Sequence, residues 1–182
     1  IDSMAEAYFW MGRLDEAIAK YKDALKVKPD FYGSMDRMQY VYAFKEDYSE
    51  ALKWIDKYIC LTPSPGLKRA GYLWKGFYYY WLGSLEKSLM DLQRAEDVAQ
   101  AVRDDVGKAF VNVLKAWIYY DRGQLELSRE YNEAWLDAYL RNYLYIKPYP
   151  YSEQYYKTIS SFLLRLIELK EKKIDSARVR LA

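Results

Sequence analysis

The segments YFWMGRLDEAIAKYKDALKVKP (8–29) and YAFKEDYSEALKWIDKYICLTP (42–63) align without a gap when the first is shifted by 34 positions, from 8 to 42. The shared positions hold aromatic, acidic, small and bulky apolar residues and a closing proline. A regular internal period of this length indicates a repeat protein, in which each unit is stabilised by stacking against its neighbours. The matched pairs are Tyr8 with Tyr42, Leu14 with Tyr48, Glu16 with Glu50, Ala17 with Ala51, Leu25 with Ile59, and Pro29 with Pro63.

The same frame recurs further along the chain. The segments YYWLGSLEKSLMDLQRA (79–95) and YYDRGQLELSREYNEAW (119–135) keep its tyrosine, its glycine, its leucine and a small residue. A weaker copy, ELKEKKIDSARVRLA (168–182), has Glu168 in place of the tyrosine. Extra residues separate the later copies, which predicts an uneven or bent superhelix rather than a regular one. These insertions fall at PSPGLK (63–68), around AQAVRDDVGK (99–108) and around YIKPYPYSEQ (145–154).

Hydrophobic periodicity predicts helices independently of the repeat. In LDEAIAKYKDALKV (14–27) the apolar residues recur at steps of three and four, and charged residues lie opposite them. Glycines between paired segments, such as Gly12 and Gly83, are suited to end a helix in a left-handed conformation. Pro29 and Pro63 mark the ends of second helices, because proline cannot continue them. The predicted helices are 1–11, 14–27, 32–45, 48–60, 67–82, 85–101, 107–121, 125–144, 154–171 and 174–182.

These residues resemble the tetratricopeptide repeat family, whose unit is a helix–turn–helix of 34 residues. The resemblance implies an all-α fold, an α-solenoid of antiparallel helix pairs with about ten helices that wind as a right-handed superhelix. Because the first and last helices look incomplete, the chain is expected to be a fragment of a longer protein. Within a single domain spanning 1–182, the expected units are about 1–31, 32–65, 69–102, 109–142 and 158–182.

Four large residues depart from the family pattern. Gln39 and Arg165 stand where the first helix of a unit normally has a small residue. Tyr58 and Trp135 stand where the second helix normally has its second alanine. Since small residues allow helices to approach closely, the second and fourth units are expected not to pack against the next helix at the usual distance.

Composition argues against several classes of function. The chain has 28 Lys and Arg against 26 Asp and Glu, a balance that does not favour nucleic acid as a partner. It has no histidine and a single cysteine, Cys60, so a zinc site, an internal disulfide and a histidine base are not expected. No phosphate-binding or hydrolase motif and no apolar run of ~20 residues occurs. We therefore expect no enzyme, no cofactor, no metal and no membrane span, and a cytoplasmic location.

The family resemblance also implies where a ligand would bind. First helices of successive units line a concave face, and the inward positions recur at steps of three and four. Such a groove would be acidic at its N-terminal end and aromatic in later units. Some family members hold the C-terminal carboxylate of a partner with lysine and asparagine side chains. Here the groove has acidic residues at that end, and their negative charge would repel a carboxylate. The expected groove residues are Glu6, Phe9, Asp36, Tyr40, Leu73, Phe77, Tyr80, Val113, Trp117, Tyr120, Phe162 and Leu166.

These expectations describe a non-catalytic protein–protein interaction scaffold that binds an apolar or aromatic peptide segment of another protein, with a basic end allowed. Taken singly, each ring could instead pack on a neighbouring helix or be covered by the chain itself. The alternative function is self-association as a homo-oligomer, or an intramolecular regulatory module of a larger bacterial signalling protein. The proline- and tyrosine-rich stretch 145–156 is a second candidate surface, or simply an ordered connector.

Overall fold

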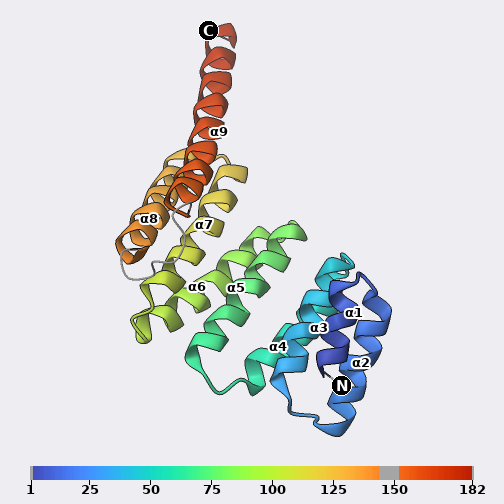
Figure 1. The fold of residues 1–182 in the computed structure, drawn as a ribbon. Helices are drawn as coiled ribbons and strands as arrows, with labels where there is room; N and C mark the ends of the chain where they lie inside the picture. The colour runs from blue at the N-terminus through green and yellow to red at the C-terminus, as the bar shows by residue number, and fades with distance from the viewer. Residues whose placement is uncertain (1, 144–151, 182) are drawn as a thin grey trace. The chain divides into compact units, whose positions relative to one another are not determined.

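The computed structural model describes the backbone of residues 2–143 and 152–181, and the side chains of residues 2–141 and 154–174. Over these ranges the chain is α-helical and contains no strand, which confirms the predicted all-α fold of paired helices (Figure 1). The first eight predicted helices match the observed ones to within two residues at each end. The helices are α1 (Asp2–Trp10), α2 (Leu14–Val27), α3 (Tyr32–Phe44), α4 (Tyr48–Leu61), α5 (Pro65–Trp81), α6 (Leu85–Ala101), α7 (Asp105–Asp121), α8 (Leu125–Tyr143) and α9 (Ser152–Leu181).

The chain divides into two compact units, residues 1–98 and 99–182, with the division near the end of α6. In unit 1, α1 packs on α2, α2 on α3, α3 on α4, and α4 on α5. The pair α5 and α6 is joined by a buried hydrogen bond. In unit 2, α7 packs on α8 and α8 on α9. Helix pairs thus stack in chain order within each unit, as a helical-repeat solenoid requires.

The first helix of each described pair ends with the same turn. In the first pair, Gly12 has a φ of +73°, and the backbone N–H of Arg13 donates to the carbonyl of Tyr8 at 2.9 Å. Glycine adopts this left-handed conformation without a steric cost, which explains the glycines of the sequence frame. The equivalent residues of positive φ are Glu46, Gly83 and Gly123, and the equivalent hydrogen bonds are Asp47 to Tyr42, Ser84 to Tyr79, and Gln124 to Tyr119.

The two helices of a pair meet at residues that are 12 positions apart in the sequence. In the first pair, Ala5 and Ala17 are both fully buried in one core cluster. In the third pair the hydroxyl of Ser88 donates to the carbonyl of Gly76 at 2.7 Å. In the fourth, Ser128 donates in the same way to the carbonyl of Ala116 at 2.8 Å. Small side chains at this crossing let the helix backbones approach closely.

Tyr58 does not hold the second pair away from the next helix, contrary to the sequence expectation. It is buried on α4, and the position facing it on α5 is Gly71. A Cβ atom at Gly71 would lie 2.5 Å from Cγ1 of Ile59 and 3.2 Å from Cδ1 of Tyr58. The missing side chain on α5 therefore provides the space that the large side chain on α4 occupies.

The first two insertions lengthen helices instead of forming long loops. Helices α5 to α8 have 17 to 19 residues, whereas α1 to α4 have 9 to 14. Pro65 begins α5. Proline is tolerated at this position because the first N–H groups of a helix have no partner within the helix. The third insertion lies largely in 144–151, outside the described residues.

A half-buried lysine on α5 connects three helices of unit 1. The ammonium group of Lys75 lies 2.7 Å from the carboxylate of Asp56 on α4 and 3.8 Å from that of Asp91 on α6. Asp91 is buried and also accepts a hydrogen bond from Arg94 at 2.7 Å. Asp91 is buried and Lys75 largely so, and their opposite charges offset part of the cost of removing them from water, whereas Asp56 is exposed.

The expected break between helices 154–171 and 174–182 is wrong, because a single helix, α9, spans Ser152–Leu181. At the place of Gly12 and its equivalents, the fifth copy has Lys172 within the run LKEKK. Lysine and glutamate favour helix, and no glycine or proline interrupts this part of the chain. In Figure 1 the C-terminal part of α9 extends beyond α7 and α8.

Replacing Gly71 with alanine should destabilise unit 1 by about 1–2 kcal/mol, because its Cβ would overlap Ile59 and the packed core cannot yield freely. Gly66→Ala, on the same helix, is the matched control, since a Cβ there meets only Oγ of Ser64 at 3.8 Å. That control should be neutral or stabilising by up to ~1 kcal/mol. Urea unfolding followed by circular dichroism measures both; equal effects would contradict the close approach at Gly71.

Candidate functional site

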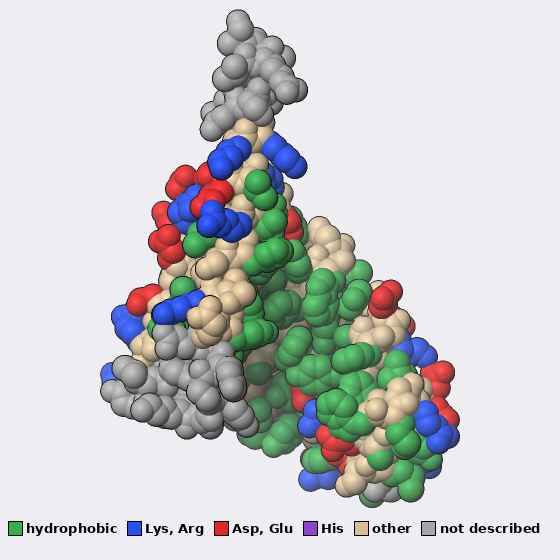
Figure 2. All heavy atoms as spheres, turned by 45° about the horizontal axis from the view of Figure 1, so that its top comes forward, with side chains coloured by type: hydrophobic (Ala, Val, Ile, Leu, Met, Phe, Trp, Pro, Cys, Tyr) green, Lys and Arg blue, Asp and Glu red, His purple; other side chains and the backbone are tan. Residues whose placement is uncertain are grey.

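Two adjoining pockets lie along the first helices of unit 1, and both are lined mainly by aromatic rings. The first, here called the α1–α3 pocket, has a volume of about 200 Å³ and lies between α1 and α3 over a residue of α2. Figure 2 shows hydrophobic side chains gathered on one face of unit 1, with charged side chains at the margin. The residues lining the α1–α3 pocket are Phe9, Trp10, Tyr21, Arg37, Tyr40, Val41 and Phe44.

The second pocket, the α3–α5 pocket, has a volume of about 370 Å³ and no charged residue in its lining. It shares Tyr40 and Phe44 with the first, so the two pockets form one continuous surface in unit 1. Ring contacts hold its wall together: Trp81 lies 5.5 Å from Tyr48 and 5.6 Å from Phe77, between ring centroids. The lining residues are Tyr40, Ala43, Phe44, Tyr48, Trp74, Tyr78 and Trp81.

Several of the lining rings are exposed to solvent. The exposed fraction is 75% for Trp10, 69% for Phe44 and 48% for Trp81. Single exposed apolar residues are common on protein surfaces, but these three line adjoining hollows. A contiguous apolar surface of this kind is typical of a binding site.

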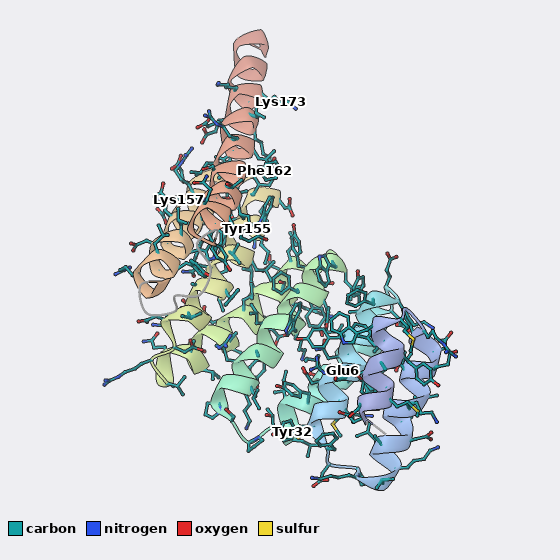
Figure 3. The ribbon with its side chains drawn as sticks, in the orientation of Figure 1. Glu6, Tyr32, Tyr155, Lys157, Phe162 and Lys173 are labelled. Carbon is teal, nitrogen blue, oxygen red and sulfur yellow. The ribbon has the colours of Figure 1, made fainter. Side chains whose placement is uncertain are left out.

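Tyr21, which lines the α1–α3 pocket, is buried and lies within the electrostatic influence of three carboxylates and of Arg37. The pKa of Tyr21 is raised to about 12, first by burial and further by the negative charges of Asp2, Glu6 and Asp36, while Arg37 opposes the shift. Glu6, labelled in Figure 3, lies on α1 and pairs with Arg37 of α3 at 3.6 Å. The hydroxyl of Tyr21 is buried and makes no hydrogen bond to any described residue.

A buried hydrogen bond supports the floor of the α3–α5 pocket. The hydroxyl of Tyr78 on α5 donates to Oε1 of Gln39 on α3, and both side chains are fully buried. Nε2 of Gln39 in turn donates to the carboxylate of Asp36 at 3.3 Å. Burial raises the pKa of Tyr78. Burial also raises the pKa of Asp36, and the hydrogen bond from Gln39 offsets part of that second shift. Gln39, the departure from the family pattern in the second unit, thus has a structural role.

The expected groove residues of unit 1 differ in whether their side chains line the pockets, pack in the core or pair with other residues. Phe9 and Tyr40 line the pockets, and Phe77 packs beside Trp74 and Trp81 behind them. Leu73 is buried, so it contributes to helix packing rather than to an accessible surface. The remaining members are Glu6, which pairs with Arg37, Asp36, which accepts from Gln39, and Tyr80, which is half-buried.

The expected groove residues of unit 2 come from α7 and α9. Trp117 and Phe162 lie 6.4 Å apart between ring centroids, and Trp117 also contacts Tyr120. Lys170 places its ammonium group 4.4 Å from the centre of the Tyr120 ring and donates to the carbonyl of that residue. Phe162 is 58% exposed, whereas Val113, Trp117, Tyr120 and Leu166 are half-buried.

Sequence reasoning missed the most exposed rings of the pockets. Phe44 lies four residues after Tyr40, and Trp81 lies four residues after Phe77. From Phe77 the predicted face continued by three positions, to Tyr80, although a step of four stays closer to the same side of a helix. The helical spacing of the sequence was therefore sufficient to predict Phe44 and Trp81 as pocket residues. Trp10 and Tyr48 lie at helix ends, where spacing within one helix cannot place them.

The described residues contain no group of three or more histidine, cysteine, aspartate or glutamate side chains arranged to hold a metal ion. Over the same residues, no helix combines the length and the apolar character needed to cross a membrane. Residues 145–151 of the proline- and tyrosine-rich stretch lie outside the described part of the chain, so this candidate surface stays a prediction.

The fold is that of the tetratricopeptide repeat proteins. Neither the protein-family models nor the sequences of curated proteins give a match to this chain. Among solved structures, it is similar to MamA, with a TM-score of 0.61 and 18% identity over 94% of this chain and 96% of that one. It is also similar to YrrB, described as a TPR protein with an unusual peptide-binding site, with a TM-score of 0.56 and 18% identity over 94% of this chain and 84% of that one.

A third similar structure is a Podosopora anserina protein described as a kinesin light chain with nearly identical TPR-like repeats. Its TM-score is 0.62 and its identity 12%, over 95% of this chain and 94% of that one. At these identities the likeness extends to the arrangement of helix pairs and not to particular site residues. The predicted resemblance to the tetratricopeptide repeat fold is confirmed.

Alkaline pH should destabilise the protein through its buried tyrosines. Burial raises the pKa of Tyr21, Tyr40 and Tyr58 from 10 to about 12. The folded state therefore holds these protons more tightly than the unfolded state. Their stabilisation is fully present below pH 10 and is lost as the pH rises from 10 through about 12. Urea unfolding at a series of pH values, with Tyr40→Phe as a comparison, measures this loss; a constant unfolding free energy would contradict it.

Proposed function

We propose that this chain is a non-catalytic protein–protein interaction scaffold that binds an apolar or aromatic segment of another protein. The observation that carries the proposal is the pair of adjoining aromatic pockets in unit 1, with exposed rings at Trp10, Phe44 and Trp81. Rings of this kind supply large contact areas at a low cost in side-chain entropy, which is why they dominate many interfaces.

The construction of the pockets supports this role. Each pocket lies between two successive first helices, so the rigid packing of the repeats holds the aromatic walls in place. The buried hydrogen bond between Tyr78 and Gln39 fixes α5 against α3 directly beneath the α3–α5 pocket. A preformed surface loses little conformational freedom when a ligand binds, and this favours affinity. The peptide-binding site described for YrrB is consistent with such a use of the fold.

The aromatic residues of unit 2 extend the proposal to a second surface. Val113, Trp117 and Tyr120 on α7, with Phe162 and Leu166 on α9, would form a further apolar contact for a partner. Trp117 and Phe162 already lie within ring-contact distance, so this surface is partly self-covered. Its contribution is therefore proposed as secondary to that of the unit 1 pockets.

Self-association is the alternative function, and one observation on α9 favours it. Tyr155, Phe162 and Leu169 are spaced seven residues apart and are 59%, 58% and 55% exposed. Residues at this spacing fall on one side of a helix, as in a coiled-coil seam. Figure 3 shows Tyr155 and Phe162 along α9, with Lys157 projecting from the other side. A regulatory module that folds back on a larger protein would use the same surface.

Replacing Phe44 and Trp81 together with alanine should weaken binding of a peptide ligand by at least ~10-fold, because both rings are accessible and line the pockets. Peptides selected from a random phage-displayed library on the purified chain serve as probes, and fluorescence anisotropy gives their affinities. The free energy of unfolding should change by about 1 kcal/mol or less, since neither ring is buried.

The matched control is Val27→Ala with Met90→Ala, two exposed apolar residues outside both pockets. This control variant should bind the selected peptides as the unmodified chain does. If the library yields no binding peptide, or if the Phe44 and Trp81 variant binds unchanged, the proposed function is wrong.

Sedimentation equilibrium tests the alternative. If α9 mediates self-association, the chain will show a concentration-dependent dimer, and Phe162→Glu with Leu169→Glu will abolish it because charges cannot be buried in an apolar seam. Lys173→Glu, at an exposed position of the same helix, is the control and should leave the dimer intact. A monomer at all concentrations would exclude self-association through this helix.

A further inference from the structure

We propose that Arg37 in the α1–α3 pocket binds the carboxylate of an acidic side chain, aspartate or glutamate, near the apolar anchor held in the α3–α5 pocket. This inference rests on the proposed function and specifies its ligand. Among the described residues that line the two pockets, Arg37 is the only charged one, and the others are aromatic apart from Val41 and Ala43. A charged group of the ligand that enters this surface therefore meets a positive charge.

The guanidinium group of Arg37 has N–H donors available for a ligand. Its side chain is 47% exposed, and the carboxylate of Glu6 lies 3.6 Å away, beyond normal hydrogen-bond length. Within the described part of the chain, this guanidinium group makes no hydrogen bond. By contrast, Arg13 and Arg94 each donate to a carboxylate at 2.7 Å. Because arginine carries five N–H donors in a planar fork that matches a carboxylate, Arg37 is suited to bind one from a ligand.

The apolar surroundings of Arg37 favour such a contact. Five aromatic residues line the α1–α3 pocket beside it. A ligand that lies on these rings displaces water from the guanidinium group and lowers the effective dielectric constant around it. A hydrogen bond between charged groups is stronger in such surroundings than in open water. The pocket can therefore discriminate between a carboxylate and a neutral group of the same shape.

Arg37 also lies on the same side of α3 as the two rings that the pockets share. Tyr40 and Phe44 follow it by three and seven residues, and steps of three and four keep residues on one face of a helix. With a rise of about 1.5 Å per residue, Arg37 and Phe44 are about 10 Å apart along the helix axis. An extended ligand advances about 3.3 Å per residue, so its acidic residue is expected about three positions from its apolar anchor.

Acidic residues on α1 and α3 raise the opposite possibility, a pocket for a basic side chain. Asp2 lines neither pocket and accepts a hydrogen bond from Ser34 at 2.7 Å. Asp36 also lies outside both linings and accepts a hydrogen bond from Gln39 at 3.3 Å. A basic side chain in the α1–α3 pocket would meet Arg37, and like charges repel in a partly buried site. The charge of the pocket lining thus favours a carboxylate.

Peptide selection tests this assignment from the ligand side. Random peptides displayed on phage and selected on the purified chain should be enriched in aspartate or glutamate about three positions from a bulky apolar residue. A selected peptide is synthesised with an amidated C-terminus, so that only side chains carry carboxylates. Replacing its acidic residue with the corresponding amide, asparagine or glutamine, should weaken binding by roughly 3- to 10-fold. Selected peptides that show no acidic enrichment, or that show basic enrichment, would overturn the inference.

Two substitutions with opposite expected effects test it from the protein side. Arg37→Gln should weaken binding of the acidic peptide by roughly 3- to 10-fold and leave its amide analogue almost unaffected. Arg13→Gln, an equal change of charge in unit 1 at a residue outside both pockets, is the control. Glu6→Gln should strengthen binding of the acidic peptide by roughly 2- to 5-fold, because Glu6 no longer competes for Arg37. For a bound basic side chain, both effects would have the reverse sign.

The thermal stability of the free protein separates this role from structural damage. Since the side chain of Arg37 is exposed and makes no hydrogen bond to a described residue, Arg37→Gln should leave the melting temperature almost unchanged. If Arg37→Gln affects the acidic peptide and its amide analogue equally, or if Glu6→Gln weakens binding of the acidic peptide, the inference is wrong. The proposed function survives that result if binding still depends on Phe44 and Trp81. Both fail if the Phe44 and Trp81 variant binds the peptides unchanged.

Discussion

The structure depends on the close crossing of the two helices in each pair. This crossing requires small residues, and the chain provides Ala5 with Ala17, Gly76 with Ser88, and Ala116 with Ser128. Where serine replaces alanine, its hydroxyl finds a backbone carbonyl on the facing helix, so the substitution buries no unsatisfied donor. Tight pairs present their remaining faces to the next pair, and this allows successive first helices to lie side by side and form the aromatic pockets.

Three of the helix pairs keep two small residues at the crossing, whereas the second pair has Gln39 opposite Ala51. Tyr58 fills a position that a small residue would normally hold, and Gly71 on the next helix compensates for it. Gln39 replaces a small residue and instead hydrogen-bonds Tyr78. These two irregularities of the second pair are thus each matched by a residue of α5. The result is a surface in unit 1 with two adjoining pockets, one with Arg37 in its lining and one without a charged residue.

Much of the fold could be predicted from the sequence, because the features that define it are local. The period, the apolar spacing and the turn glycines placed eight helices to within two residues. The pairing of Tyr58 with Gly71 could not be predicted, since it joins residues on different helices whose contact no spacing rule encodes. The continuity of α9 was not predicted, because the break was placed by analogy with the other repeat copies. No glycine or proline near Lys172 supports a helix end there. Trp10 and Tyr48 were missed because they lie at helix ends, where spacing within one helix cannot place them. Phe44 and Trp81 were missed because the predicted face did not follow the step of four residues from Tyr40 and Phe77.

The hydrogen bond from Tyr78 to Gln39 also limits how freely the repeats can be rearranged. In an ideal repeat protein a unit can be deleted, duplicated or exchanged, because every junction makes the same apolar contacts. Here the second and third pairs share one specific polar contact between fully buried side chains. Removing either pair alone would strand a phenol or an amide without its partner. At this junction the array is therefore not modular, because neither pair can be removed without leaving a buried polar group of the other unpaired.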